Sequence, residues 1–443
     1  MIKLRAPLFL FALLASLFVP VQNVQAQNAK PVKLAIRAAR MIDGKSDTPV
    51  MNPVILIEGE KITAVGASLL IPADAKVIDL GNLTLLPGLI DAHTHLLLDM
   101  NGSDDSMFNF VASESTAARA LRGAKLGREE LEAGITTVRD VGNSGVNGDI
   151  ALRNAINNGW LPGPRIDAST RALAAPGGQF GSLIPEAQKI IEQEYVTLNG
   201  PDSARQAVRQ ALYDGAECIK VIVNGSPANV TLDEMKAIVE EAHTSGVKVA
   251  AHATDDKATR IAVEAGVDSV EHAYVISDET LKTMAAKHIF LVPTDGTLRE
   301  YVNMTFGHRQ PTAEERAELE KQFKPWIAGN GARLQRALKF GVPIAFGSDA
   351  YVTMPDETRG EVSLDTLEAY ADEGMTPLQI IHAATSNAAE LLGWQSKIGT
   401  LEAGKFADII AVPGDPLKDA TTLKHARFVM KGGEVIRNDA SRP

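Results

Sequence analysis

Cysteine is almost absent from this chain of 443 residues, which contains only Cys218. An intrachain disulfide is therefore excluded, and a chain of this length can bury enough surface to be stable without one. Cys218 stands in an apolar run, which favours a small core residue over a nucleophile. No Gly-x-Ser-x-Gly motif is present either, so a serine hydrolase of the nucleophile-elbow type is not expected.

Basic residues are outnumbered by acidic ones, 44 to 55, and the formal net charge is −11. A negative chain is repelled by phosphate backbones and by anionic lipids. We therefore predict no nucleic-acid partner and no membrane surface as partner. Apolar residues make up 45% and charged residues 22%, which is ordinary for a globular protein with a well-formed core.

Residues 1–26 differ in composition from the rest of the chain. Lys3 and Arg5 precede an apolar stretch over 6–20, and Ala26 ends a group of small residues of the kind that signal peptidase reads. The stretch is short for a bilayer span of about 20 residues. We predict a cleaved signal peptide and an exported protein, periplasmic or secreted; a membrane anchor is the alternative. No cysteine follows the stretch, so a lipid anchor is not expected.

Both ends of the remaining chain are rich in strand-forming residues. Residues 54–57 and 62–65 flank a Gly-containing turn, and residues 428–430 and 434–436 flank Gly432 and Gly433. Apolar runs separated by such short turns are typical of β-hairpins. We predict that 27–85 and 396–443 together form one small β-sandwich domain.

The middle of the chain, 86–395, alternates short apolar runs with amphipathic stretches. Repeated β-then-α units predict an α/β fold, a (β/α)8 TIM barrel, as the catalytic domain. The alternative is an open doubly wound sheet, but the Gly-rich phosphate loop expected after its first strand is missing. The eight predicted strands are Leu86–Ala92, Ile135–Val141, Arg165–Ser169, Cys218–Val223, Val247–His252, Ser269–His272, Ile289–Pro293 and Pro343–Phe346.

Histidines stand where several of these strands end, which is where barrel enzymes place their working residues. His93 and His95 are two residues apart, a spacing that puts both side chains on one face of a strand. His252 and His272 each close a later strand, and Asp349 follows the last one. Imidazole and carboxylate suit a metal such as zinc. A single pair could consist of unrelated histidines, but the full set predicts a metal site.

Lys220 lies inside a strand that looks buried on both faces. A buried ammonium is unfavourable without a partner, and burial favours the neutral amine. A neutral amine can react with carbon dioxide to give an anionic carbamate, which could bridge two metal ions. The alternative is an ion pair with an acid such as Asp349.

The whole set resembles the binuclear amidohydrolase superfamily. Residues 86–95 are similar to its opening motif, and residues 404–408 are similar to the segment that returns to its sheet domain. The resemblance implies two divalent metal ions, with zinc as the first expectation and manganese or cobalt as alternatives, and a homo-oligomer. It also implies the ligands: His93, His95 and Asp349 on one metal, His252 and His272 on the other, and carboxylated Lys220 between them.

Within the superfamily, residues 215–221 and 136–140 resemble the prolidase-like branch, which includes Xaa-Pro and Xaa-Arg/Lys dipeptidases and ochratoxin-cleaving amidases. Gly177–Phe180 departs from the Gly-Gly-His form of the dipeptidases, which shifts the expectation toward N-acyl amino acids. The predicted substrate is a small molecule with an amide or peptide bond. Substrate preference is expected in the loops 96–115, 170–200 and 296–330.

The predicted reaction is amide hydrolysis by metal-activated hydroxide, with Asp349 accepting the proton of the water and passing it to the leaving amine. Arg139 follows the second strand and could bind a substrate carboxylate, or could pair with Asp140 or Glu132. A cyclic amidase, a decarboxylase on the same scaffold and a non-catalytic binding relative are the alternative functions.

Overall fold

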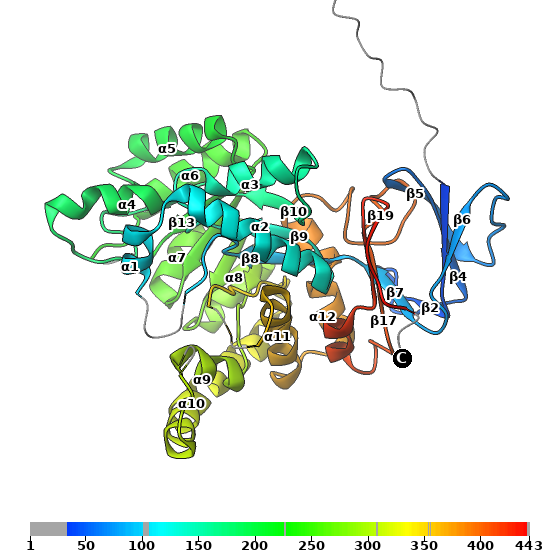
Figure 1. Ribbon diagram of the computed structural model, residues 1–443. Coiled ribbons are helices and arrows are strands. Elements are labelled where there is room, and N and C mark those ends of the chain that lie inside the picture. Colours follow the sequence, from blue (N-terminus) through cyan, green and yellow to red (C-terminus); the bar gives the residue numbers. More distant parts are fainter. Residues whose placement is uncertain are drawn as a thin grey trace, which may run out of the picture.

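Two small sheets are built from the ends of the chain, the first from N-terminal strands alone and the second from strands of both ends (Figure 1). The computed structural model describes residues 33–100, 106–225, 227–306, 309–352, 354 and 356–440. The predicted signal peptide lies outside these residues. The first sheet has the order β5-β4-β1-β6, with β1 (Lys33–Arg37), β4 (Pro53–Glu58), β5 (Lys61–Ala67) and β6 (Lys76–Asp79).

The second sheet has the order β19-β18-β17-β7-β2-β3 and joins the two ends of the chain. Its strands are β2 (Arg40–Met41), β3 (Val50–Met51), β7 (Thr84–Pro87), β17 (Ile409–Val412), β18 (Phe428–Lys431) and β19 (Glu434–Asn438). The β4–β5 and β18–β19 pairs are antiparallel, so both predicted hairpins are confirmed. One apolar cluster takes Ile36 and Ile55 from the first sheet and Leu85 and Ile409 from the second, so the two sheets bury a common core.

Parallel strands and helices alternate through the middle of the chain. The strands are β8 (Leu89–Thr94), β9 (Ile135–Asp140), β10 (Arg165–Ala168), β11 (Ala172–Ala174), β12 (Tyr195–Thr197), β13 (Cys218–Ile222), β14 (Lys248–Ala253), β15 (Ser269–His272) and β16 (Phe290–Val292). They form one sheet in the order β10-β9-β8 and another in the order β12-β11-β13-β14-β15-β16. This parallel, sequential order is consistent with a TIM barrel and differs from the reversed order of a doubly wound sheet.

The first predicted strand, Leu86–Ala92, is wrong as one element, because it divides at Gly88. Residues before Gly88 pair with β17 in the terminal sheet, whereas β8 pairs with β9. A Cβ atom at Gly88 would lie only 2.2 Å from the Thr136 hydroxyl oxygen. The chain therefore changes sheets at a residue where there is no space for a side chain. The short strands β11 and β12 were not predicted.

The eighth predicted strand, Pro343–Phe346, is also corrected, since it makes only an isolated bridge between Ile344 and Leu291. The Ala345 amide donates to Leu291 over 3.0 Å, and the Ala92 amide donates to Phe346 over 2.8 Å. Pro343 has no amide to donate, and the amide of Phe346 donates to Ala383 instead of to a strand. The segment lies between β16 and β8 without forming a continuous ladder, so the strands do not close into a single sheet.

Helices follow most of the strands and pack against them around a large apolar core. They are α1 (Met107–Ser113), α2 (Thr116–Ala133), α3 (Gly148–Asn157), α4 (Gln188–Glu194), α5 (Pro201–Asp214), α6 (Leu232–Thr244), α7 (Asp256–Ala265), α8 (Asp278–Lys287), α9 (Leu298–Phe306), α10 (Ala313–Phe340), α11 (Arg359–Asp372), α12 (Pro377–Ala383) and α13 (Ser386–Leu391). Cys218 is fully buried in β13, as predicted. Among the described residues, no helix combines the length and apolarity that a bilayer span requires.

Candidate metal centre

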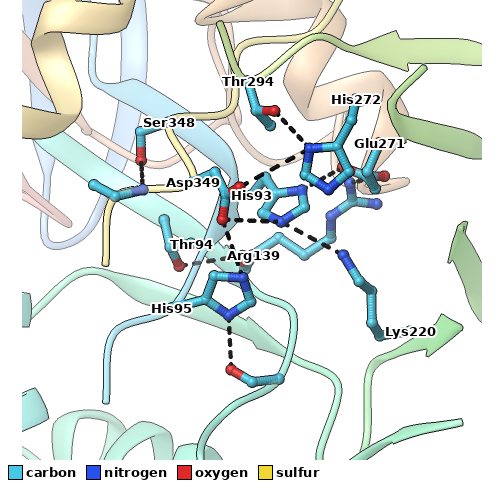
Figure 2. Close-up of polar contacts among 12 residues, drawn as sticks. His93, Thr94, His95, Arg139, Lys220, Glu271, His272, Thr294, Ser348 and Asp349 are labelled. Atoms are coloured by element: carbon cyan, nitrogen blue, oxygen red, sulfur yellow. Dashed lines mark hydrogen bonds and ion pairs between the residues drawn. The ribbon is translucent and has the colours of Figure 1, made fainter. Parts of the chain in front are cut away.

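The six predicted metal ligands line one chamber of about 310 Å³. We call them the floor of the chamber: His93, His95, Lys220, His252, His272 and Asp349. They come from β8 and the residue after it, from β13, β14 and β15, and from the segment after Phe346. Figure 2 shows His95, Lys220 and His272 around His93 and Asp349. The strand ends thus bring together residues that are far apart in the sequence, as the barrel prediction required.

Asp349 lies between three imidazoles (Figure 2). Its Oδ1 atom is 3.2 Å from Nε2 of His95 and 3.6 Å from Nε2 of His93, and its Oδ2 atom is 3.9 Å from Nδ1 of His272. One potential ligand atom from each of His93, His95 and Asp349 falls within 4.8 Å of the others. Two imidazoles and one carboxylate at this spacing fit a divalent cation by both donor chemistry and reach.

Lys220 and His252 lie next to His93 and His272. The Lys220 amine is 3.4 Å from Nε2 of His93, and the ring centroids of His252 and His272 are 4.6 Å apart. No carboxylate of the described chain lies within ion-pair distance of the amine, so the expected alternative, a Lys220–Asp349 pair, is not formed. Burial lowers the pKa of Lys220 to about 8, more than the nearby Glu271 and Asp349 raise it. The amine therefore has substantial neutral character near pH 8.

Three histidines of the floor, His93, His252 and His272, are held in their neutral form. Burial lowers the pKa of His93 to about 4 and that of His252 to about 3, and the pKa of His272 is also well below its usual range. The pKa of Asp349 is lowered overall. Burial alone would raise it, but the neighbouring His93 and His95 outweigh that effect. Neutral imidazoles and an ionised carboxylate are the forms that bind metals.

Glu271 holds the imidazole ring of His93 in place, and this role was not predicted. Its Oε2 atom is 2.7 Å from Nδ1 of His93, and its Oε1 atom is 2.9 Å from Nη2 of Arg139. Arg139 also donates to the carbonyl of Ala92 over 2.6 Å. A carboxylate on the far nitrogen fixes the tautomer and the ring plane of a ligand histidine. The signal in the sequence was a glutamate and an arginine inside two of the predicted strands, since charged residues need a partner when buried.

This geometry corrects the expectation that Arg139 contacts the substrate. Arg139 is fully buried and does not line the chamber. It pairs with Glu271, and neither Asp140 nor Glu132 is its partner. Arg139 lies on β9 beneath the imidazole of His93, so its guanidinium points into the protein interior and not into the chamber.

The backbone at the floor is held in unusual conformations. His272 has φ +74° and Asp349 has φ +52°, both in the left-handed region that residues with a side chain seldom adopt. Arg333 donates to the carbonyl of His272, and the amide of Asp349 donates to His93 over 2.9 Å. These contacts hold the strained turns in place, a feature that is concentrated at functional sites.

Asp91 ties β8 to the turn that carries Asp349. Its Oδ1 atom accepts from the amides of His93 and Ser348, each over 3.0 Å. Its other oxygen is buried without a hydrogen-bond partner in the described structure. Burial raises the pKa of Asp91 to about 7. The sequence singled out Asp91 only as part of the opening motif, without a role.

Loops supply the rest of the chamber. We call its upper lining the walls: Asn143, Gln179, Tyr195, Tyr274, Tyr351, Met100 and Met107. A smaller lobe of about 80 Å³ adjoins the chamber at Tyr274, Asp349 and Tyr351 and is completed by Glu300, Tyr301 and Met304 of α9. The three loops expected to carry substrate preference therefore do border the site, although the sequence did not indicate which of their residues face it.

The fold and the floor together define an α/β enzyme with a candidate metal centre, and comparison with known proteins agrees. The model of the amidohydrolase family matches residues 84–436. Ochratoxinase from Aspergillus niger is 30% identical over 445 residues, covering 92% of this chain and 87% of that protein. The chain therefore belongs to the amidohydrolase family.

Solved structures give the same result. A Xaa-Pro dipeptidase with methionine bound in its active site superimposes with a TM-score of 0.76 at 30% identity, covering 91% of this chain and 99% of that one. The A. niger ochratoxinase structure superimposes with a TM-score of 0.77 at 27% identity, covering 93% and 97%. These likenesses confirm the predicted family and its prolidase-like and ochratoxinase neighbours, and they support an amide or peptide hydrolase.

Proposed function

We propose that this protein hydrolyses the amide bond of an N-acyl amino acid or a dipeptide and releases an amino acid. The observation that carries this proposal is the convergence of the six floor residues in one chamber, with ligand atoms of His93, His95 and Asp349 within 4.8 Å of one another. The kinship with an ochratoxinase and a Xaa-Pro dipeptidase supports the choice of bond.

Two divalent cations fit the floor, with zinc as the first metal to test. His93, His95 and Asp349 would hold one, His252 and His272 would hold the other, and Lys220, carboxylated by carbon dioxide, would bridge them. The neutral character of Lys220 and the absence of a paired acid within reach support the carboxylation. When bound, such ions supply Lewis acidity toward the amide carbonyl and make water a stronger nucleophile.

Asp349 is the residue that we propose moves the proton. Its side chain is 20% exposed to the chamber, whereas the side chain of His93 is only 1% exposed, so the carboxylate is open to water and substrate. Hydrolysis adds water across the C–N bond: the hydroxyl goes to the carbonyl carbon and the proton to the leaving nitrogen. Asp349 accepts that proton from the water and returns it to the nitrogen as the amine departs. Glu271 and Arg139 keep the ring of His93 oriented throughout.

A substrate panel with metal analysis tests this function. The purified chain would be assayed with N-acyl-phenylalanine, Xaa-Pro and Xaa-Arg/Lys dipeptides, before and after chelation and after return of zinc, manganese or cobalt. We expect close to two metals per chain, turnover of at least one substrate, and loss and recovery of turnover with the metal. No turnover across the panel at full metal content would contradict the proposal.

We also propose that residues 1–26 direct export, and that 27–85 with 396–443 and 86–395 are the two domains of the mature enzyme, the second a (β/α)8 barrel. The composition of the first segment and the apolar core shared by the terminal sheets support this. N-terminal sequencing of protein recovered from the periplasm or medium tests the first point. Light scattering tests the homo-oligomer implied by the family resemblance.

A further inference from the structure

The strand β16 ends beside the floor, although none of the six floor residues comes from it. It is followed by Pro293, Thr294 and Asp295, and the last two are buried, with exposed fractions of 6% and 0%. A polar side chain that is buried needs a hydrogen-bond partner. For both of these residues, the contacts lead to His272 at the end of the neighbouring strand β15.

The Thr294 hydroxyl lies against the imidazole ring of His272 (Figure 2). Its Oγ1 atom is 2.7 Å from Nδ1 of His272, and it donates to the carbonyl of Pro293 over 2.7 Å. A hydroxyl has one proton to donate. Because that proton goes to Pro293, Oγ1 accepts a hydrogen bond from Nδ1 of His272. The Tyr274 hydroxyl and Oδ2 of Asp349 lie farther from Nδ1, at 3.5 and 3.9 Å.

This hydrogen bond selects one tautomer of His272. A neutral imidazole carries a single N–H, and the bond made by one ring nitrogen decides which of the two holds the proton. With the proton on Nδ1, the Nε2 atom keeps its lone pair, which is what a divalent cation binds. The other tautomer would leave Nε2 protonated and unable to act as a ligand. Thr294 thus does for His272 what Glu271 does for His93, but with a neutral acceptor.

Asp295 and Arg333 act on the backbone of the same ligand. Asp295 pairs with Arg333 of α10, and the guanidinium also donates to the carbonyl of His272. Arg333 is 1% exposed, so this network lies in the interior. His272 has φ +74°, a conformation that persists only when its surroundings hold it. Two consecutive residues after β16 therefore reach one ligand, Thr294 at its ring and Asp295, through Arg333, at its backbone.

The backbone of Thr294 is itself in an unfavourable conformation. Its φ is +56°, in the left-handed region, where a β-branched side chain is rarely found. Glycine would adopt this conformation without strain, but it has no hydroxyl to offer to His272. Such strain is concentrated at functional sites, which fits a threonine that is required for its hydroxyl.

We propose that Thr294 is a positioning residue of the metal centre, which holds Nδ1–H of His272 so that Nε2 is the nitrogen available to a divalent cation. The inference rests on the proposed function, because His272 is one of the ligands assigned there, and it adds a residue that supports the second of the two metals. Thr294 also borders the smaller lobe, so a contact with the substrate is the competing role.

Cobalt binding tests the proposal without any substrate. The metal-free full-length enzyme would be titrated with Co²⁺, and the amount bound and the visible absorption spectrum would be measured. In Thr294→Val the branched shape is kept and the hydroxyl is lost, so we expect the affinity for one of the two ions to fall by about 10- to 100-fold, with a changed spectrum. Thr294→Ser keeps the hydroxyl and should bind cobalt as the natural enzyme does.

Thr259→Val in α7 is the matched control, because it removes a buried hydroxyl that donates to the carbonyl of Asp255 over 2.8 Å, outside the chamber. It should leave both cobalt ions unaffected. Should Thr294→Val not fold, Thr294→Ala also removes the hydroxyl and carries the same expectation, with the unfolding temperature as the check on folding.

Three results would overturn the role of Thr294. They are natural cobalt affinity and spectrum in Thr294→Val, an equal loss in Thr294→Ser, and a change in KM alone, which would make the residue a substrate contact. Normal cobalt binding by the natural enzyme without turnover of any substrate in the panel would instead contradict the proposed hydrolysis and leave this inference standing. A natural enzyme that binds no cobalt, zinc or manganese would overturn both.

Discussion

The floor and the walls of the chamber are built in different ways. Five floor residues lie on or directly after a parallel strand, and Asp349 follows the bridging segment that ends at Phe346. Buried contacts hold them, such as those of Glu271 to His93 and Arg333 to His272. The walls come mainly from loops, with Met107 from α1 and Tyr195 from the short strand β12, and Gln179 among them is exposed. Rigid strand ends suit a centre that must hold atoms within tenths of an ångström, whereas loops can change without disturbing it. The reaction type should therefore depend on the floor and the choice of substrate on the walls.

The largest effect is expected from Lys220→Ala. The variant removes the group proposed to bridge the metals, so turnover should fall below detection and bound metal should decrease. The fold should persist, because the chamber beside Lys220 can admit water. Added short-chain carboxylate, such as propionate, should restore part of the activity by supplying two oxygens at the same place. Lys236→Ala, on the exposed face of α6, is the control.

Unchanged turnover in Lys220→Ala would contradict the proposal that Lys220 bridges the two metals. Metal analysis, circular dichroism and activity with and without propionate distinguish a lost bridge from a lost fold.

The next effect is expected from Asp349→Asn. An amide can still occupy the space next to His95 but cannot accept a proton from water, so kcat should fall by about two to four orders of magnitude. Because Asp349 is only one of several ligands, metal content should remain within about a factor of two of that of the natural enzyme. Asp278→Asn, on the surface at the start of α8, is the matched control. Equal kcat values for the natural enzyme and Asp349→Asn would assign the proton transfer to another group.

A smaller effect is expected from Glu271→Gln, which leaves the floor residues intact but weakens their support. The ring of His93 loses its carboxylate, so metal affinity should fall by about 10- to 100-fold. Arg139 loses its buried partner, which should cost about 3–5 kcal/mol in the free energy of unfolding. Excess metal should restore much of the activity, and urea unfolding should show the lost stability.

Full activity in Glu271→Gln at limiting metal would mean that the floor does not need this support. Such a result would weaken the distinction between a rigid floor and adaptable walls.

The floor could be predicted because most of its residues lie in strands that the apolar pattern makes recognisable, and because parallel strand ends meet at one face. Leu86–Ala92 and Pro343–Phe346 were less predictable: one changes sheets at Gly88, and the other contains a proline and donates to Ala383. Both features depend on tertiary partners that are distant in sequence.

The partner of Arg139 could not be predicted. The sequence suggested a substrate carboxylate, Asp140 or Glu132, whereas Glu271 is more than a hundred residues away and becomes its neighbour only in the folded sheet. The residues of the walls follow no hydrophobic periodicity in the sequence from which they could have been predicted. Gln179 and Tyr195 stand in a long loop with two strands of three residues each, and only the fold shows that they face the chamber.

The smallest effect is expected from Tyr301→Phe in the smaller lobe. The Tyr301 hydroxyl accepts from the amide of Gly296 over 3.3 Å, and its removal leaves the ring and the floor in place. We expect kcat/KM to change by less than about tenfold, a single lost hydrogen bond, with the change differing between substrates that fill the lobe and those that do not. Tyr213→Phe, on the exposed surface of α5, is the control and should behave as the natural enzyme. A uniform loss of kcat across all substrates, with metal content unchanged, would show that this residue of the smaller lobe takes part in the reaction itself, so that the floor would no longer be the only part of the site that determines the reaction.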